Sequence, residues 1–124
     1  MKLDTRVLVI DDDPWLIDEY ARTLGVAGYI VERASNALDG MEVLDRLHPD
    51  CIVLDLFMPG PNGLVLLHEM RSHSDLSRIP VILISNAAAD LKVAALQPYG
   101  VRQVLDKTTM TPSDIVAAVR RHTV

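Results

Sequence analysis

The chain has 124 residues, the size of one ordinary domain, and 49% of them are hydrophobic. A chain of this length can bury a core without disulfides or a structural metal, and this composition excludes a disordered protein. The net charge is −5 at pH 7 and lysine and arginine form no cluster, which argues against nucleic-acid binding by the chain.

The first half of the chain alternates short apolar segments with longer helical ones. Val7–Ile10 is apolar on both faces, and a helical period from Leu16 to Leu24 follows it, with Pro14 placed for a first helical turn. A weaker apolar segment at Tyr29–Val31 precedes a second helical period from Leu38 to Leu47. Short continuous runs rich in Val and Ile are typical of strands covered on both sides, as in a parallel sheet.

The second half repeats the alternation three times. In chain order it predicts a strand at Ile52–Leu54, a helix from Leu64 to Met70, a strand at Val81–Ile84, a helix from Ala88 to about Gln97 stopped by Pro98 and Gly100, a weaker strand at Val101–Leu105 and a last helix from Ile115 to Val119. The run Thr111-Pro112-Ser113-Asp114 places a capping hydroxyl, an N1 proline and an acid at the start of that last helix. Five strands alternating with five helices, joined by right-handed crossovers, predict an α/β three-layer sandwich.

Cellular context follows from what the chain lacks. No apolar stretch approaches the roughly 18 residues of a membrane-spanning helix, and the first residues lack the apolar core of a signal peptide. Cys51, the only cysteine, lies in an apolar run, where we expect a buried and unreactive thiol in a reducing compartment. We therefore expect a single cytoplasmic domain over residues 1–124, without a membrane segment.

Chemically active side chains follow four of the five expected strands. They are Asp11, Asp12 and Asp13 after the first strand, Asp55 after the third, Ser85 after the fourth and Lys107 after the fifth. In open α/β sheets the ligand site lies outside the carboxyl ends of the strands, so we expect these groups to converge. Clustered carboxylates repel one another unless a hard divalent cation joins them, and Mg²⁺ prefers oxygen ligands. A nearby ammonium and hydroxyl would stabilise a bound phosphoryl group.

Each of these residues alone has a purely structural interpretation. A single aspartate after a strand is most often a helix cap, and Asp13, directly before Pro14, is expected to be one. Ser85 alone would be a turn residue, and Lys107 alone a solvated charge. Their conjunction across four separate strand ends favours a phosphate-handling metal site.

In that order the motifs resemble a receiver domain of response regulators in two-component signalling, over essentially the whole chain. The matching stretches are Val7–Pro14 for the first strand and its acidic pair, Asp55–Gly63 for the phosphoacceptor loop, Ile79–Ser85 for the fourth strand with its terminal hydroxyl, and Lys107 for the lysine that ends the fifth strand. The resemblance implies a flavodoxin-like fold, with a five-stranded parallel sheet in the order 2-1-3-4-5. It also implies a partner, either a sensor histidine kinase or a histidine phosphotransfer protein.

The resemblance assigns a role to each site residue. Asp55 would be the nucleophile that accepts the phosphoryl group from phosphohistidine. Lys107 would pair with the Asp55 carboxylate and then with the phosphoryl group, and Ser85 would donate a hydrogen bond to a phosphoryl oxygen. The implied ligands of Mg²⁺, for which Mn²⁺ can substitute, are Asp12 and Asp55 directly, Asp11 largely through water, and the backbone carbonyl of Phe57.

Three positions depart from the family's usual pattern. Asn86 follows the hydroxyl where a small residue is common, and Thr108 follows Lys107 where proline is usual, so we do not expect the family's cis peptide bond. Val104 stands where the aromatic switch residue is expected. The resemblance implies output through the face of the fourth helix, fifth strand and fifth helix, as a self-dimer or with a partner, and with Val104 in place we expect it without an aromatic rotamer switch.

Two other interpretations stay open at this point. Asp11 and Asp13 have the spacing of the Asp-x-Asp motif of haloacid-dehalogenase-type phosphatases, but Trp15 is atypical for that motif and Asp55 would have no role. A pseudo-receiver would keep the fold as a protein-binding module without regulation by phosphorylation. The complete set of site residues argues against it.

Overall fold

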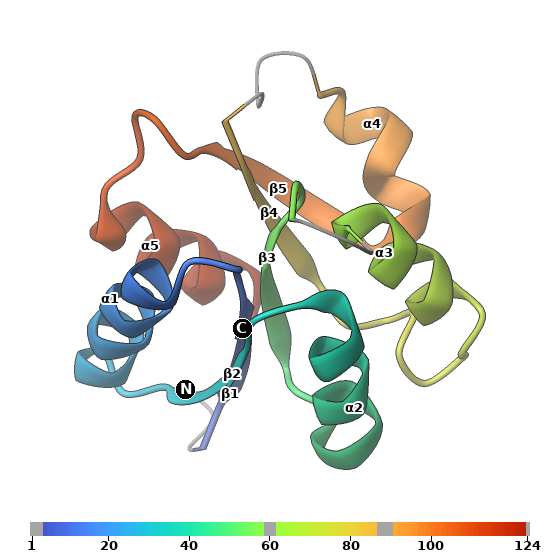
Figure 1. Cartoon of the computed structure of the whole chain (residues 1–124), viewed down its shortest axis with the longest axis horizontal. Helices are drawn as coiled ribbons and strands as arrows, with labels where there is room; N and C mark the ends of the chain where they lie inside the picture. Colours follow the sequence, from blue (N-terminus) through green and yellow to red (C-terminus); the bar gives the residue numbers. More distant parts are fainter. Residues whose placement is uncertain (1–3, 59–61, 87–90, 124) are drawn as a thin grey trace.

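The computed structural model describes residues 4–58, 62–86 and 91–123. Five parallel strands form one sheet in the order β2-β1-β3-β4-β5, which confirms the predicted topology. Helices α1 and α5 cover one face of the sheet and α2, α3 and α4 cover the other (Figure 1). The elements are β1 (Arg6–Ile10), α1 (Pro14–Val26), β2 (Ile30–Ala34), α2 (Ala37–Leu47), β3 (Cys51–Asp55), α3 (Gly63–Arg71), β4 (Val81–Ser85), α4 (Val93–Leu96), the 3₁₀ helix η2 (Gln97–Tyr99), β5 (Val101–Asp106) and α5 (Pro112–His122).

Burial follows the order of the strands in the sheet. Every residue of β3 and β4 is buried, and so is every residue of β1 after Arg6. The edge strands β2 and β5 are partly exposed, which explains why their apolar signal in the sequence is weaker. Cys51 lies in this core without a disulfide partner, as predicted, and burial raises the pKa of its thiol to about 12.

Two hydrophobic clusters hold the helices against the sheet. Alternate residues of β1 point to opposite faces, so Leu8 and Ile10 pack with α2 and α3 while Val7 and Val9 pack with α1 and α5. This arrangement fixes β1 and β3 side by side, with Ile10 paired to Leu54 at the carboxyl edge. The residues that follow these two strands must therefore lie close together.

Polar residues cap the helices at the same edge. Asp13 accepts hydrogen bonds from the backbone N–H groups of Trp15 and Leu16, which confirms its predicted role at the start of α1. Thr111 and Asp114 form the predicted capping box at the start of α5.

The prediction of the fourth helix was wrong in two respects. Residues 88–90 lie outside the described residues, but Leu91 and Lys92 are not helical, and α4 is a single turn from Val93. Lys92 has extended backbone angles and no side chain caps the helix, so the helix does not extend N-terminally through Lys92. Pro98 does not end the helical segment, because it lies in the first turn of η2, where its missing N–H costs nothing. Gly100 ends η2 in the left-handed conformation, with φ of 87°.

Candidate functional site

Three carboxylates predicted to share a site do lie together. One oxygen each from Asp11, Asp12 and Asp55 lies within 4.8 Å of the other two. Asp11 and Asp12 follow β1 and Asp55 ends β3, so the pairing of these two strands creates the cluster. Asp11 and Asp55 are buried, with exposures of 1% and 4%, whereas Asp12 is exposed. The cluster is therefore a buried acidic pocket with one carboxylate at its mouth.

Lys107 closes the pocket from the β5 side. Its Nζ lies 3.1 Å from Oδ2 of Asp11 and 3.3 Å from Oδ2 of Asp55, and only 17% of its side chain is exposed. The three residues come from the ends of three different strands, so the fold, and not local sequence, brings them together. One ammonium thus faces two buried carboxylates.

Backbone hydrogen bonds hold the strand ends that carry these groups. The N–H of Asp11 donates to Ala34, and the N–H of Asp13 donates to Oδ1 of Asp11 over 2.9 Å, which orients that carboxylate. The N–H of Leu56, directly after Asp55, donates to the carbonyl of Ile84 over 3.2 Å. The pocket is therefore supported from β2, from the turn into α1 and from β4.

The electrostatic balance of the pocket favours an additional cation. Burial, together with the negative charge of Asp11, raises the pKa of Asp55 to about 6, although Lys107 opposes the shift. Burial also raises the pKa of Asp11. Burial would lower the pKa of Lys107, but the two carboxylates beside it raise that pKa overall. The single ammonium therefore leaves the carboxylates short of positive charge.

The chemistry of the donor set fits Mg²⁺. The cluster offers three carboxylates, which are hard oxygen ligands, and the exposed Asp12 leaves a side open to water. Mg²⁺ is bound in proteins by one or two carboxylates and retains several waters. The assignment of the Phe57 carbonyl as a further ligand stays a prediction.

Ser85 ends β4 beside the pocket. It is buried, with 1% exposure, and its carbonyl accepts a 3.0 Å hydrogen bond from the backbone N–H of Lys107. Phe57 is 54% exposed and lies two residues beyond Asp55. Asn86 is exposed, and Ala87, the second position beyond Ser85, lies outside the described residues. The described residues contain no cis peptide bond, as expected from Thr108.

One structural feature of the site was not predicted from the sequence. The Asp106 side chain, directly before Lys107, accepts hydrogen bonds from both the N–H and the hydroxyl of Thr108. In turns an aspartate side chain commonly bonds to the backbone two positions ahead. That signal was present in the sequence beside the expected lysine.

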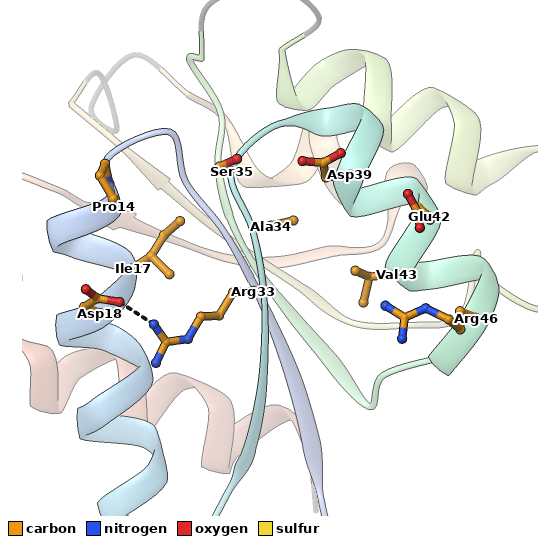
Figure 2. Close-up of a pocket in the computed structure, with 10 residues that line it drawn as sticks. All are labelled: Pro14, Ile17, Asp18, Arg33, Ala34, Ser35, Asp39, Glu42, Val43 and Arg46. Carbon is orange, nitrogen blue, oxygen red and sulfur yellow. Dashed lines mark hydrogen bonds and ion pairs between the residues drawn. The ribbon is translucent and has the colours of Figure 1, made fainter.

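A separate hollow lies away from the acidic pocket, between α1 and α2 at the β2 edge of the sheet (Figure 2). Its volume is about 450 Å³, and an ion pair between Asp18 and Arg33 lies at its α1 side. Its lining includes none of Asp11, Asp12, Asp55, Ser85 and Lys107. The candidate chemistry therefore lies in the acidic pocket and not in this hollow.

With this geometry in view, comparison with known proteins assigns the chain to a family. The family model described as "Response regulator receiver domain" matches residues 7–120. The chain belongs to this family. Receiver domains are signalling switches of two-component systems and not classical enzymes, which leaves the phosphatase hypothesis without support.

Curated relatives of the receiver domain are longer than this chain. The nitrate/nitrite response regulator protein NarL of Escherichia coli K12 is 39% identical over 117 residues, which are 93% of this chain and 53% of that protein. The DNA-binding dual master transcriptional regulator RpaA of Synechocystis is 35% identical over 80 residues, or 64% of this chain and 33% of that protein. The chain thus spans about half, or less, of the length of these relatives.

Solved structures share the fold. The signal receiver domain of a putative LuxO repressor protein from Vibrio parahaemolyticus superposes with a TM-score of 0.86 at 23% identity, covering 98% of this chain and 91% of that one. Chemotaxis protein CheY4 of Vibrio cholerae gives a TM-score of 0.83 at 22% identity, covering 96% of this chain and 98% of that one.

Among the residues described, no helix has the length and apolar character needed to span a membrane.

Proposed function

We propose that this receiver domain is a phosphorylation switch in which Asp55 accepts a phosphoryl group from a phosphohistidine. The donor would be a sensor histidine kinase or a histidine phosphotransfer protein. The observation that carries the proposal is the contact of one ammonium, Lys107, with two buried carboxylates, Asp11 and Asp55. Burying two carboxylates with one cation is costly for folding, so a functional reason is required.

The metal in this proposal is Mg²⁺, with Mn²⁺ as a substitute. Asp12 and Asp55 would hold it directly, Asp11 largely through water, and the backbone carbonyl of Phe57 would complete the set of protein ligands. When bound, Mg²⁺ neutralises negative charge on the phosphoryl oxygens and the carboxylates during transfer.

The residues of the chain then have distinct tasks. A carboxylate oxygen of Asp55 attacks the phosphorus in line with the P–N bond, so the new O–P bond forms as the P–N bond breaks and the imidazole leaves. The raised pKa of Asp55, about 6, still leaves it mostly ionised and nucleophilic at pH 7. Lys107 leaves the carboxylate for a phosphoryl oxygen, and the Ser85 hydroxyl donates to another.

Phosphorylation would change partner binding through these same two residues. The new contacts of Ser85 and Lys107 with the phosphoryl group are the differential interactions that bias the conformation of the loop after β4 and of α4. We propose that the face of α4, β5 and α5 carries the output, as a self-dimer or with a protein partner. Within this proposal residues 1–124 act as one cytoplasmic domain that does not contact nucleic acid or membrane itself.

Phosphorylation by acetyl phosphate tests the proposal directly. The wild-type chain in Mg²⁺ should gain the mass of one phosphoryl group, and Asp55→Ala should not. Asp45→Ala, which removes an exposed carboxylate of α2, is the matched control and should be modified normally. Equal modification of Asp55→Ala, or full modification in EDTA, would contradict the proposal. An unmodified wild type would favour a pseudo-receiver that only binds proteins.

A further inference from the structure

The turn that follows β5 is organised around one residue, Asp106. Its carboxylate oxygen Oδ1 accepts a 2.9 Å hydrogen bond from the N–H of Thr108 and a 2.6 Å bond from the Thr108 hydroxyl. Its backbone carbonyl accepts from the N–H of Thr109 over 3.2 Å and from the N–H of Met110 over 2.9 Å. Each of the three residues after Lys107 is therefore bonded to Asp106.

Lys107 lies inside this hydrogen-bonded turn. On its N-terminal side Asp106 pairs with Ser85 in the β4–β5 ladder, and the N–H of Lys107 continues that ladder by donating to the Ser85 carbonyl. On its C-terminal side Thr108 is held by the Asp106 side chain. The backbone is thus fixed on both sides of the residue whose ammonium reaches Asp11 and Asp55.

We propose that Asp106 is the positioning residue for Lys107, acting together with the hydroxyl and N–H of Thr108. The inference rests on the proposed function, in which the Lys107 ammonium moves from Asp55 to the transferred phosphoryl group. Asp106 itself touches no reacting atom.

The physical reason lies in the length of the lysine side chain. Lys107 reaches the pocket through a long four-carbon chain, so a rotation of its backbone has to be offset by new side-chain torsions before the ammonium can contact Asp11 and Asp55 again. A displacement of about 1 Å at a reacting group can cost up to about a hundredfold in rate. Proline at position 108 would restrict φ by its ring, but threonine does not. Hydrogen bonds to other residues therefore have to fix the turn. The hydrogen bonds from Thr108 also keep the pKa of Asp106 below its ordinary value, so the acceptor stays charged.

A purely structural role for Asp106 has to be distinguished from a positioning role. Asp114 provides the comparison, because its carboxylate also accepts a backbone hydrogen bond at the start of α5, from Thr111 over 2.8 Å. Removing Asp114 should disturb the same turn-to-helix region and should change the net charge by the same amount as removing Asp106. It should not disturb the residues beside Lys107. Asp114→Ala is therefore the matched control for Asp106→Ala.

The test measures the rate of phosphorylation by acetyl phosphate as a function of Mg²⁺ concentration, on the full chain. Asp106→Ala should lower the maximal rate about fivefold without changing the Mg²⁺ concentration at half-maximal rate. Asp106→Asn, which keeps an acceptor oxygen, and Thr108→Ser, which keeps the hydroxyl, should retain the wild-type rate, as should Asp114→Ala. Thr108→Val, which removes only the hydrogen bond of the hydroxyl, should lower the rate about twofold. This variant tests the inference if Asp106→Ala does not fold.

A double-variant cycle with Lys107→Ala decides whether Asp106 acts through the lysine. If it does, Asp106→Ala or Thr108→Val should cause no further loss in the Lys107→Ala background. The inference is overturned if Asp106→Ala folds and reacts at the wild-type rate, if Asp114→Ala slows the reaction equally, or if the loss persists in the Lys107→Ala background. An unmodified wild type would instead reject the proposed function, so the two failures are distinguishable.

Discussion

The backbone N–H of Lys107 donates a 3.0 Å hydrogen bond to the carbonyl of Ser85. This bond extends the β4–β5 ladder one residue beyond the strand, so the ammonium and the hydroxyl assigned to the phosphoryl group emerge from adjacent strand ends. A rearrangement at Ser85 is therefore coupled through the backbone to Lys107. The same coupling links Asp55 to β4, because the N–H of Leu56 donates to the carbonyl of Ile84 over 3.2 Å.

The buried Asp55 carboxylate should make the metal-free protein less stable as pH rises. Burial raises the pKa of Asp55 from 3.8 to about 6 in the folded state. Because the pKa is raised in the folded state, the unfolded chain loses this proton at a lower pH than the folded chain does. The stabilising contribution of the proton on Asp55 is therefore complete below about pH 4 and is lost by about pH 6. In EDTA, the unfolding free energy of wild type relative to Asp55→Asn should fall by about 2–3 kcal/mol between pH 4 and pH 7. Urea denaturation at several pH values measures it, and a flat difference would show that Asp55 titrates normally.

Gly63 should be intolerant of even one added methyl group. A Cβ at this position would lie 3.0 Å from the Cα of Leu56 and 3.2 Å from the carbonyl oxygens of Asp55 and Leu56, all backbone atoms of the phosphoacceptor loop. Backbone cannot move aside as a side chain does, so Gly63→Ala should destabilise the protein by about 1–3 kcal/mol and slow phosphorylation.

Gly25→Ala is the matched control for that substitution. A Cβ at Gly25, inside α1, would meet nothing within 4 Å. Alanine is the better helix former, so this variant should gain up to about 1 kcal/mol. Thermal and urea unfolding of both variants check the pair, and equal effects at the two glycines would refute the steric argument.

Phe57 should slow hydrolysis of the phosphorylated state. It lies two residues beyond Asp55 and is 54% exposed. An aromatic ring at the mouth of the pocket excludes water from the aspartyl phosphate, whereas an amide can orient it. We expect Phe57→Asn to lose its phosphoryl group several-fold faster, a change of about 1 kcal/mol in the barrier. The decay of phosphorylated protein after removal of acetyl phosphate measures this, with Phe57→Leu as the apolar control. Unchanged or slower decay in Phe57→Asn would refute shielding.

Trp15 should report metal binding without any added label. It is the only tryptophan, it is 70% exposed, and its backbone N–H donates to Asp13, next to the proposed metal ligand Asp12. Mg²⁺ at the acidic pocket should therefore change its fluorescence emission. Asp12→Asn should weaken the titration about tenfold or more, whereas Asp45→Ala should not change it. Titration curves that coincide for Asp12→Asn and wild type would place the metal elsewhere.

The sequence predicted the fold and the acidic pocket because both depend on alternation. Apolar runs at Val7–Ile10 and Val81–Ile84 mark buried strands, and residues after parallel strands meet at one edge whatever their distance in sequence. It did not predict the short α4, because alanine-rich sequence favours a helix, whereas Lys92 is extended and no side chain caps the start of α4. Asp106 was missed because its role lies in hydrogen bonds within the turn, which apolar periodicity does not reveal.

The segment from α4 to η2 belongs to the proposed output face of α4, β5 and α5. Tyr99, at the end of η2, is held against α3, with its ring 5.0 Å from that of His68 and the Arg71 guanidinium 5.2 Å from its centre. The start of α4 lacks a side-chain cap, and Val93 is exposed. The two ends of the segment from α4 to η2 are therefore fixed unequally.

We expect phosphorylation to move the start of α4 while Tyr99 stays on α3. With beryllofluoride and Mg²⁺, amide chemical shifts should change strongly at residues 91–93 and little at residues 97–99. Val104, in place of an aromatic switch, should show a shift change without a rotamer exchange. Tyr99→Leu removes both ring contacts and should extend the changes to residues 97–99, and sedimentation of the same samples reports self-association. Changes confined to residues around Asp55 in the wild type would exclude this output route.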